Sequence, residues 1–138
     1  METSLPLSID LYHNDVKVWK SNISLITHEI TFIENLTNSY IFEPRIPNLF
    51  EKLEHFKTHI RKIKNRLDTL VQSLTKHDAE LSGMLECDTV SCDVFFETKH
   101  LSIKEDYRDF IDTYNEVKTE IFNYCGTILK SNKCQDNK

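Results

Sequence analysis

The sequence has 138 residues with a net charge of −5, 28% charged residues and 39% hydrophobic residues, which fits one soluble domain with a modest core. It contains only two glycines, which argues against phosphate-binding loops, Rossmann turns and hairpin-rich β folds, because these need the left-handed backbone that glycine adopts most easily. The charge is negative and the lysines are scattered among acidic residues, so nucleic acid is not an expected partner.

The first residues, METSLPLSID, have neither the basic nor the continuously apolar segment of a secretory signal. No stretch approaches the roughly 18 apolar residues of a membrane span. We therefore expect a cytoplasmic protein without a membrane partner, whose cysteines stay reduced. Cys87 and Cys92 form a C-x4-C pair, but no second such pair completes the pattern of a zinc site.

Three segments carry apolar residues at alternating steps of three and four, the 3.5-residue period of helices that wind around one another. The first segment predicts a helix over about residues 8–37. Its apolar stripe consists of Leu5, Ile9, Tyr12, Val16, Trp19, Ile23, Ile26, Ile30 and Ile33. Leu25, Phe32 and Leu36 widen this stripe toward a second neighbour, which is typical of a helix in a bundle.

Pro44 and Pro47 interrupt helical hydrogen bonding and predict a short reversal after the first helix, so that the first two helices run antiparallel. The second helix is expected over about residues 48–86, starting at the capping-box pattern Asn48-x-x-Glu51. Its stripe consists of Leu49, Leu53, Phe56, Ile60, Ile63, Leu67, Leu70, Leu74, His77, Leu81 and Met84, of which only the histidine is not apolar.

Residues 87–101, CDTVSCDVFFETKHL, are predicted to form an ordered apolar loop between the second and third helices. Val94, Phe95 and Phe96 make this segment too apolar for a solvated linker. Two roles remain open for these three side chains, because they could cover the end of the core or bind a partner.

The third helix is predicted over about residues 102–131, starting at the capping-box pattern Ser102-x-x-Glu105. Its stripe consists of Ile103, Tyr107, Phe110, Tyr114, Val117, Ile121, Tyr124 and Ile128. The expected fold is therefore all-α: residues 1–138 form one domain, an up-down-up antiparallel bundle of three long helices with coiled-coil-like seams.

Reversals centred near residues 43 and 93 would fix how the helices align. This alignment places Trp19 opposite Leu67, and it places His77 in the layer of Phe110. The start of the first helix would lie in the same layer as His77. That end of the bundle is therefore the expected place for any chemistry.

His77 is predicted to occupy a core position, where its ring nitrogens need partners once they leave water. The favoured interpretation is a structural histidine that is hydrogen-bonded to a tyrosine or carboxylate, with the candidates Asp10, Tyr12, Asp109 and Tyr114. The alternative is a metal site near His13 and His77, with Asp10 and Asp109 as further candidate ligands. The Glu-x-x-His motif of metal-carrying helical bundles does not occur in any stripe.

Five segments, YHNDVKVW, THEITFIENL, LEHFKTHI, LTKHDAEL and DYRDFIDTYNEVKTEIF, resemble small uncharacterised helical-bundle proteins of Bacteroidetes bacteria. The matching positions are His13 and Trp19 in the first helix and His77 and Asp78 late in the second. The resemblance implies a bacterial, cytosolic helical bundle. It implies no particular activity.

The sequence contains no motif for catalysis, because neither the cysteines nor the serines have a histidine at a predictable distance and the stripes leave no obvious cleft. We therefore expect a noncatalytic helical bundle without a cofactor, acting through a protein partner or as a homo-oligomer. The alternative function is that of a metal-binding bundle built around His13 and His77.

Overall fold

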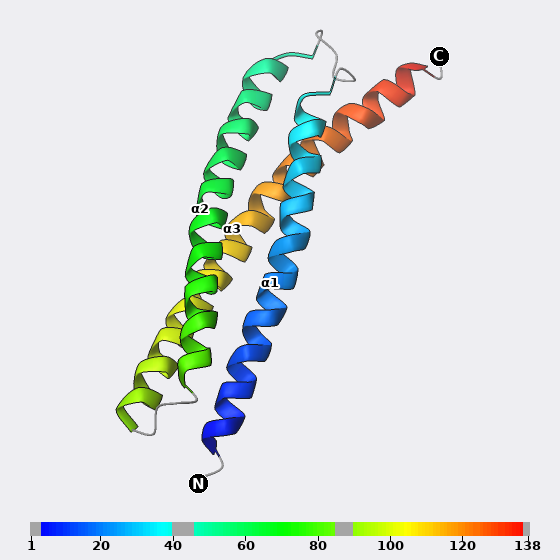
Figure 1. Ribbon diagram of the computed structural model, residues 1–138. Helices are drawn as coiled ribbons and strands as arrows, with labels where there is room; N and C mark the ends of the chain where they lie inside the picture. Colours follow the sequence, from blue (N-terminus) through cyan, green and yellow to red (C-terminus); the bar gives the residue numbers. More distant parts are fainter. Residues whose placement is uncertain (1–3, 40–45, 85–89, 137–138) are drawn as a thin grey trace.

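The computed structural model describes the backbone of residues 4–39, 46–84 and 90–136 (Figure 1). It contains three helices, α1 (Ser4–Thr37), α2 (Leu49–Met84) and α3 (Val90–Asp136). In Figure 1, α1 and α2 lie side by side and α3 crosses behind both. Because α2 packs against each of the other two helices, the all-α, up-down-up prediction is confirmed.

Most described residues of the predicted stripes are buried in the core, and the others, Tyr12, Leu53, Tyr107, Val117 and Tyr124, are partly buried and pack against it. Buried residues on α1 are Val16, Trp19, Ile23, Ile26, Ile30 and Ile33. Those on α2 include Leu49, Phe56, Ile60, Ile63, Leu67, Leu70, Leu74 and Leu81. Those on α3 include Ile103, Phe110, Tyr114, Ile121 and Ile128. Burial of a large apolar side chain stabilises a fold by about 1.5–3 kcal/mol, so these layers are the main source of stability.

The start of α3 differs from the prediction. The helix begins at Val90, so a loop over 87–101 and a helix start at Ser102 are both wrong for the described part of that segment. Residues 87–89 lie outside the described residues. The three-and-four spacing of the stripe continues backward from Ile103 through His100, and neither glycine nor proline interrupts the chain there.

The apolar residues of this early part of α3 do not share one role. Phe96 is half-buried and packs against the core, so it covers the end of the bundle. Val94 and Phe95 remain exposed. Their binding of a partner therefore stays a prediction.

The start of α2 agrees with the sequence, because the helix begins immediately after Asn48. Asn48 has a φ of 61°, a left-handed conformation that asparagine tolerates better than most residues. Its carbonyl accepts the first helical hydrogen bond, from the backbone nitrogen of Lys52 at 3.0 Å. This conformation sets the direction in which the chain enters α2.

The alignment of the helices also differs from the prediction. His77 contacts His100 rather than lying beside Phe110, whose ring instead faces the guanidinium of Arg66 at 5.9 Å. The pairing of α2 with α3 is consequently shifted relative to the one that a reversal near residue 93 predicts, and α3 starts well before the predicted position. Between α1 and α2, Lys20 contacts Asp78 and Glu34 contacts Lys64, so these helices are shifted relative to the predicted pairing of Trp19 with Leu67.

The parallel helices α1 and α3 are joined by three side-chain hydrogen bonds at regular intervals, which we call the α1–α3 ladder. Its partners lie 85 residues apart in each case, and successive bonds are one heptad apart, as expected for two parallel helices that wind around each other. The three pairs are Asp15 with His100 at 2.9 Å, Asn22 with Tyr107 at 2.8 Å, and Glu29 with Tyr114 at 2.6 Å.

None of the three described helices contains an apolar stretch of the length that crossing a bilayer requires.

Candidate functional site: a buried histidine pair

Two consecutive hydrogen bonds connect three side chains, one from each helix. Nε2 of His77 on α2 lies 2.9 Å from Nδ1 of His100 on α3. Nε2 of His100 in turn lies 2.9 Å from Oδ2 of Asp15 on α1. We call these three residues the histidine chain. It joins all three helices at the end of the bundle where α1 and α3 begin.

The two histidine rings are almost completely removed from water. His77 is 0% exposed and His100 is 2% exposed, whereas Asp15 is partly exposed. The rings of Tyr12 and Trp19 stack on His100, with centroid distances of 4.2 and 5.1 Å. Because two aromatic rings stack on the His100 ring and both of its nitrogens are hydrogen-bonded, its orientation is fixed by its surroundings.

The acceptor at the outer end determines the positions of the protons. An ionised Asp15 carboxylate can only accept a hydrogen bond, so His100 carries a proton on Nε2. When the His100 ring is neutral, its Nδ1 has a lone pair and accepts a hydrogen bond from the Nε2–H of His77. This leaves His77 Nδ1 with a lone pair, and that atom is buried without a hydrogen-bond partner.

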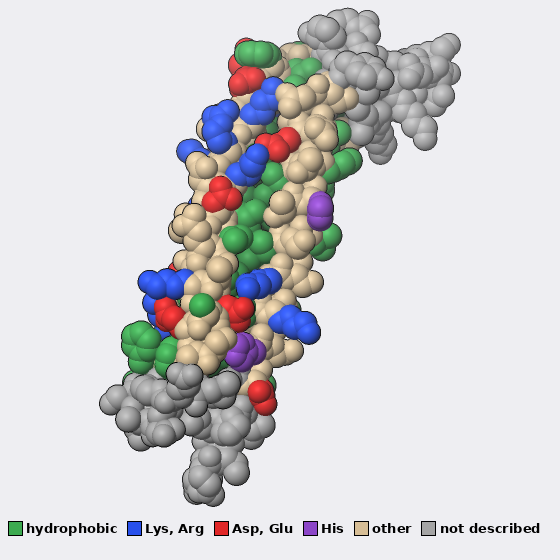
Figure 2. All heavy atoms as spheres, viewed as in Figure 1, with side chains coloured by type: hydrophobic (Ala, Val, Ile, Leu, Met, Phe, Trp, Pro, Cys, Tyr) green, Lys and Arg blue, Asp and Glu red, His purple; other side chains and the backbone are tan. Residues whose placement is uncertain are grey.

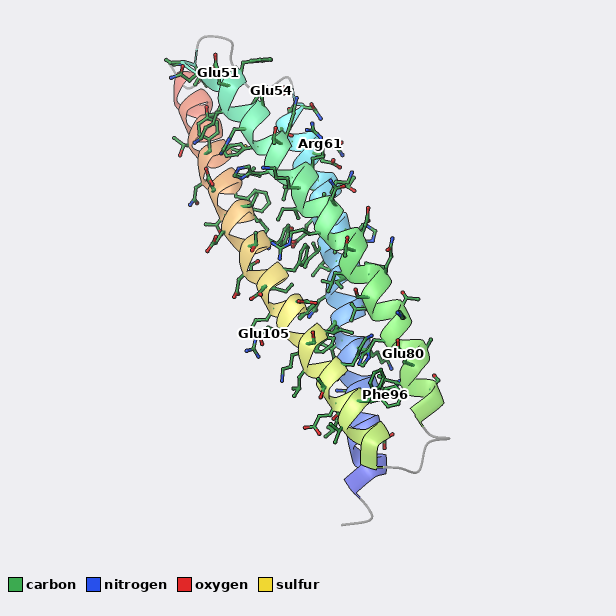
Figure 3. The ribbon with its side chains drawn as sticks, turned by 90° about the vertical axis from the view of Figure 1, so that its left-hand side faces the viewer. Glu51, Glu54, Arg61, Glu80, Phe96 and Glu105 are labelled. Carbon is green, nitrogen blue, oxygen red and sulfur yellow. The ribbon has the colours of Figure 1, made fainter. Side chains whose placement is uncertain are left out.

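A second buried acceptor lies one helical turn further along α2. Oε2 of Glu80 is also buried without a hydrogen-bond partner, while its Oε1 lies 3.8 Å from the Lys99 amine of α3. In Figure 3, Glu80 and Phe96 appear at the same end of the bundle, on α2 and α3 respectively. The end of the core next to His77 is therefore polar on one side.

Burial has a large effect on the protonation of His77. Loss of solvation lowers its pKa from 6.5 to about 4, and the charges of His100 and Lys99 act in the same direction. Glu80 and Asp78 act in the opposite direction but are outweighed. His77 is consequently neutral at pH 7. A fully buried neutral imidazole can accept a proton, but it cannot meet a substrate unless the bundle opens.

Asp78 forms a second polar contact between α1 and α2 at the surface of the same end. It lies 3.1 Å from the amine of Lys20 and 3.3 Å from Nδ1 of His13. Partial burial raises the pKa of Asp78, but its hydrogen bonds and charge interactions with Lys20 and His13 hold the pKa below its ordinary value. All three side chains are partly solvent-exposed, so these ion pairs contribute little to stability.

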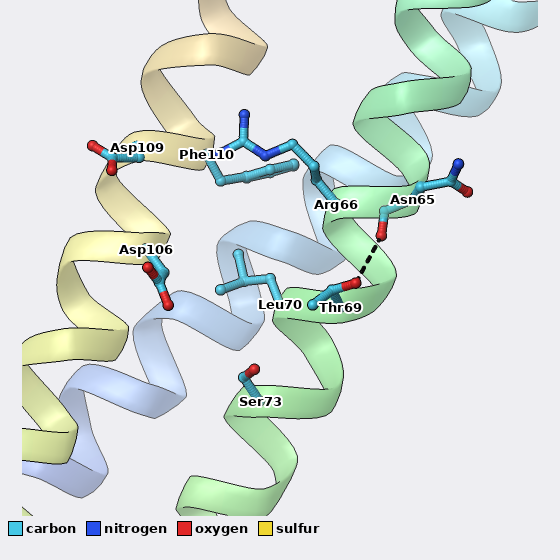
Figure 4. Close-up of a pocket in the computed structure, with 8 residues that line it drawn as sticks. All are labelled: Asn65, Arg66, Thr69, Leu70, Ser73, Asp106, Asp109 and Phe110. Atoms are coloured by element: carbon cyan, nitrogen blue, oxygen red, sulfur yellow. Dashed lines mark hydrogen bonds between the residues drawn. The ribbon is translucent and has the colours of Figure 1, made fainter.

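The structure separates the candidate metal ligands that the sequence indicated. His13 contacts Asp78 rather than His77, and Asp10 is exposed. Asp109 lines a surface pocket of about 370 Å³ between α2 and α3, where Figure 4 shows its carboxylate turned away from Phe110 and the guanidinium of Arg66. Within the described parts of the chain, no three His, Cys, Asp or Glu side chains converge as metal ligands would.

The structure gives His77 a partner that the sequence did not indicate. A tyrosine or carboxylate was expected, whereas the direct partner is His100 and the carboxylate is one hydrogen bond further away. His100 was missed because it was placed in a loop. The spacing of Phe96, His100 and Ile103 in steps of four and three was the available signal.

The third bond of the α1–α3 ladder, which we call its upper bond, joins a carboxylate to a tyrosine hydroxyl instead of an imidazole. The Tyr114 hydroxyl donates to Oε1 of Glu29 at 2.6 Å, and the Lys118 amine lies 3.2 Å from the same oxygen. The hydrogen bond from Tyr114 lowers the pKa of Glu29; burial raises it less strongly, and Lys118 lowers it further. Burial and the contact with Glu29 raise the pKa of Tyr114 well above its ordinary value. This pair therefore keeps its charge distribution over a wide pH range.

Comparison of the chain with protein-family models, with curated proteins and with solved structures finds no match. The protein is accordingly a small all-α protein of three helices, and its resemblance to Bacteroidetes proteins stays a prediction.

Proposed function

We propose that this protein is a noncatalytic helical bundle that self-associates through the outer face of α1. The observation that supports the proposal is a row of exposed apolar residues at intervals of seven, which we call the outer stripe. It consists of Leu11, Val18, Leu25 and Phe32, which are 62%, 48%, 60% and 58% exposed. Leu25, Phe32 and Leu36 were expected to meet a second neighbour. Leu36 packs against the core and the ring of Phe32 contacts that of Phe122 on α3, while most of the surface of Leu25 and Phe32 faces solvent.

The outer stripe is long and has few charges beside it. Residues at intervals of seven form an almost straight line along a helix, so the four side chains extend over about 30 Å. On one side of the stripe the neighbours one turn away include the exposed, uncharged Asn14, Ser21 and Asn35. On the other side Asp15 and Glu29 are paired with His100 and Tyr114 of α3. In Figure 2, hydrophobic side chains appear along the right-hand edge of the molecule, where charged groups are sparse over its middle. Depletion of charge around exposed apolar residues is typical of protein interfaces.

A second copy of the chain fits this face. When two α1 helices pair antiparallel about a twofold axis, Leu11 of one copy faces Phe32 of the other, and Val18 faces Leu25. The stripe therefore complements itself. Each copy would bury on the order of several hundred Å², which is the size of a reversible rather than a permanent interface. The bacterial origin and cytoplasmic location expected from the sequence belong to the same proposal.

Sedimentation equilibrium over a wide range of protein concentration tests the proposal. The wild-type protein should form a reversible dimer, and Leu25→Glu should weaken dimerisation by at least about tenfold because it places a charge within the apolar contact. Phe50→Glu is the matched control, because Phe50 is 73% exposed at the start of α2 and lies outside the outer stripe.

Circular dichroism of each variant shows whether the bundle is intact. A wild-type protein that stays monomeric at all concentrations would overturn the proposal. So would a folded Leu25→Glu variant that dimerises as strongly as the wild-type protein.

A further inference from the structure

The contact between His77 and His100 can exist only while one of its two facing nitrogens lacks a proton. These atoms, Nε2 of His77 and Nδ1 of His100, lie 2.9 Å apart, and a hydrogen bond between them needs one hydrogen and one lone pair. When both rings are doubly protonated, both facing nitrogens carry a hydrogen. The attraction then becomes a repulsion between two positive rings that are shielded from water.

The surroundings accommodate one positive ring better than two. On α1, Asp15 accepts directly from His100 and can balance its charge. Among the described residues no carboxylate is hydrogen-bonded to His77: Oε1 of Glu80 lies 3.8 Å from the Lys99 amine of α3, and its Oε2 has no hydrogen-bond partner.

The remaining titratable groups at this end are already engaged with other partners. Asp78 on α2 is occupied by His13 and Lys20 of α1. Tyr12 of α1 stacks on His100 and carries no charge at neutral pH. A positive charge on His77 is consequently balanced only by the longer-range attraction of Glu80 and Asp78, which the effect of burial outweighs.

We propose that Asp15, His100 and His77 form a proton-operated latch. It holds the three helices together at this end of the bundle, and it releases them when both histidine rings have become doubly protonated and positively charged. The ligand of this site is thus the proton itself. The released segment contains the first half of α1 and the early part of α3. The inference does not depend on self-association.

The other end of the bundle provides an internal reference. Among the described residues, His77 and His100 are the buried histidines, whereas His28 and His55 are exposed. The core around Ile33 and Ile121 therefore contains no equivalent group. Uptake of protons should loosen one end of the molecule before the whole chain unfolds.

The direction and the pH range follow from the burial of His77. In the closed structure burial lowers its pKa to about 4, whereas in the opened segment the ring has its ordinary value near 6.5. Between these two pH values the opened segment binds more protons than the closed one, so acidification favours opening. The equilibrium between the two should shift by up to about 300-fold over this range, and it should not change above pH 6.5.

Trp19 allows a direct test, because it is the one tryptophan of the sequence and stacks on His100. We expect acrylamide to quench the fluorescence of Trp19 more strongly as the pH falls from 6.5 toward 4. The helical signal in far-ultraviolet circular dichroism should be mostly retained over the same range. His77→Gln should abolish this transition, because an amide forms hydrogen bonds but does not titrate. The matched control is His13→Gln, which changes a partly exposed histidine at the same end and should keep the transition.

Hydrogen exchange of the wild-type protein tests the latch without any variant. Peptides covering residues 10–20 and 94–104 should lose protection on acidification, while peptides covering 56–66 and 112–122 keep it. Equal loss at both ends would overturn the proposal, as would a folded His77→Gln variant whose Trp19 transition is unchanged. If His77→Gln does not fold, the exchange pattern of the wild-type protein decides.

Discussion

The first and last bonds of the α1–α3 ladder involve or adjoin buried groups whose pKa values are shifted in opposite directions, downward for His77 and upward for Tyr114. Each joins a carboxylate of α1 to a ring of α3, and the two bonds are 14 residues apart on each helix. In the first bond the ring is His100, whose other nitrogen contacts a second buried histidine. In the upper bond the ring is Tyr114, which stays neutral until strongly alkaline pH. The chemistry of the ring, rather than its position, determines when each end of the bundle is stable.

The apolar core is where a substitution should have the largest effect. Ile63 is buried on α2 and lines the same pocket as Thr113 and Val117 of α3, next to the bond between Glu29 and Tyr114. Ile63→Asp places a charge without a partner in this apolar layer. We expect a loss of several kcal/mol, enough to unfold the domain and to break both bonds together. Thermal unfolding followed by circular dichroism measures the loss.

Lys62→Asp is the control for the added negative charge, because this neighbour is exposed and the change should shift the melting temperature only slightly. A melting curve of Ile63→Asp that matches the wild-type curve would show that the packing of α2 is not as described.

The free energy of unfolding should fall on both sides of neutral pH. We call these two decreases the acid arm, which comes from His77, and the alkaline arm, which comes from Tyr114. The pKa of His77 is lowered in the folded state, so its contribution is complete above pH 6.5 and is lost as the pH falls to about 4, by at most about 3 kcal/mol. The pKa of Tyr114 is raised, so its contribution is complete below pH 10 and is lost at higher pH. Urea unfolding between pH 4.5 and 11 measures both arms, because below pH 4.5 the protonation of Glu29, whose pKa is lowered in the folded state, also costs stability.

Two variants should remove one arm each. His77→Gln should flatten the acid arm and leave the alkaline arm, while Tyr114→Phe should do the reverse, because phenylalanine keeps the ring but cannot ionise. The comparison between the two bonds would be wrong if either variant changed both arms equally.

The sequence predicted the parts of this architecture that depend on periodicity. The burial of Val16, Ile63 and Phe110 follows from their spacing, because only one face of a helix can enter the core. The start of α3 could not be predicted from the spacing of apolar residues. The pattern Ser102-x-x-Glu105 has the composition of a capping box, but it occurs inside a continuous helix.

That one error explains why the site was only half predicted. His77 was recognised because it interrupts an apolar stripe, but its partner lay in the segment taken for a loop. Alignment depends on where each helix begins, so the misplaced start displaced His77 toward Phe110 and hid its contact with His100. Contacts between helices come from the packing of whole faces, which the spacing within one helix does not determine.

The smallest effect is expected at His77 itself when leucine replaces it. Leucine restores an apolar layer and removes the buried Nδ1 atom that has no partner, which favours the variant. It also leaves Nδ1 of His100 without a donor, which opposes this gain by about 1–3 kcal/mol. Because the two effects nearly cancel, His77→Leu should fold and melt within a few degrees of the wild-type protein at pH 7, as measured by calorimetry. At pH 4.5 the same variant should be the more stable of the two, because it has lost the group that takes up the second proton. A variant that melts far below the wild-type protein at both pH values would show that the His77–His100 contact stabilises the fold at neutral pH, and that the histidine pair is kept for structure rather than for its response to protons.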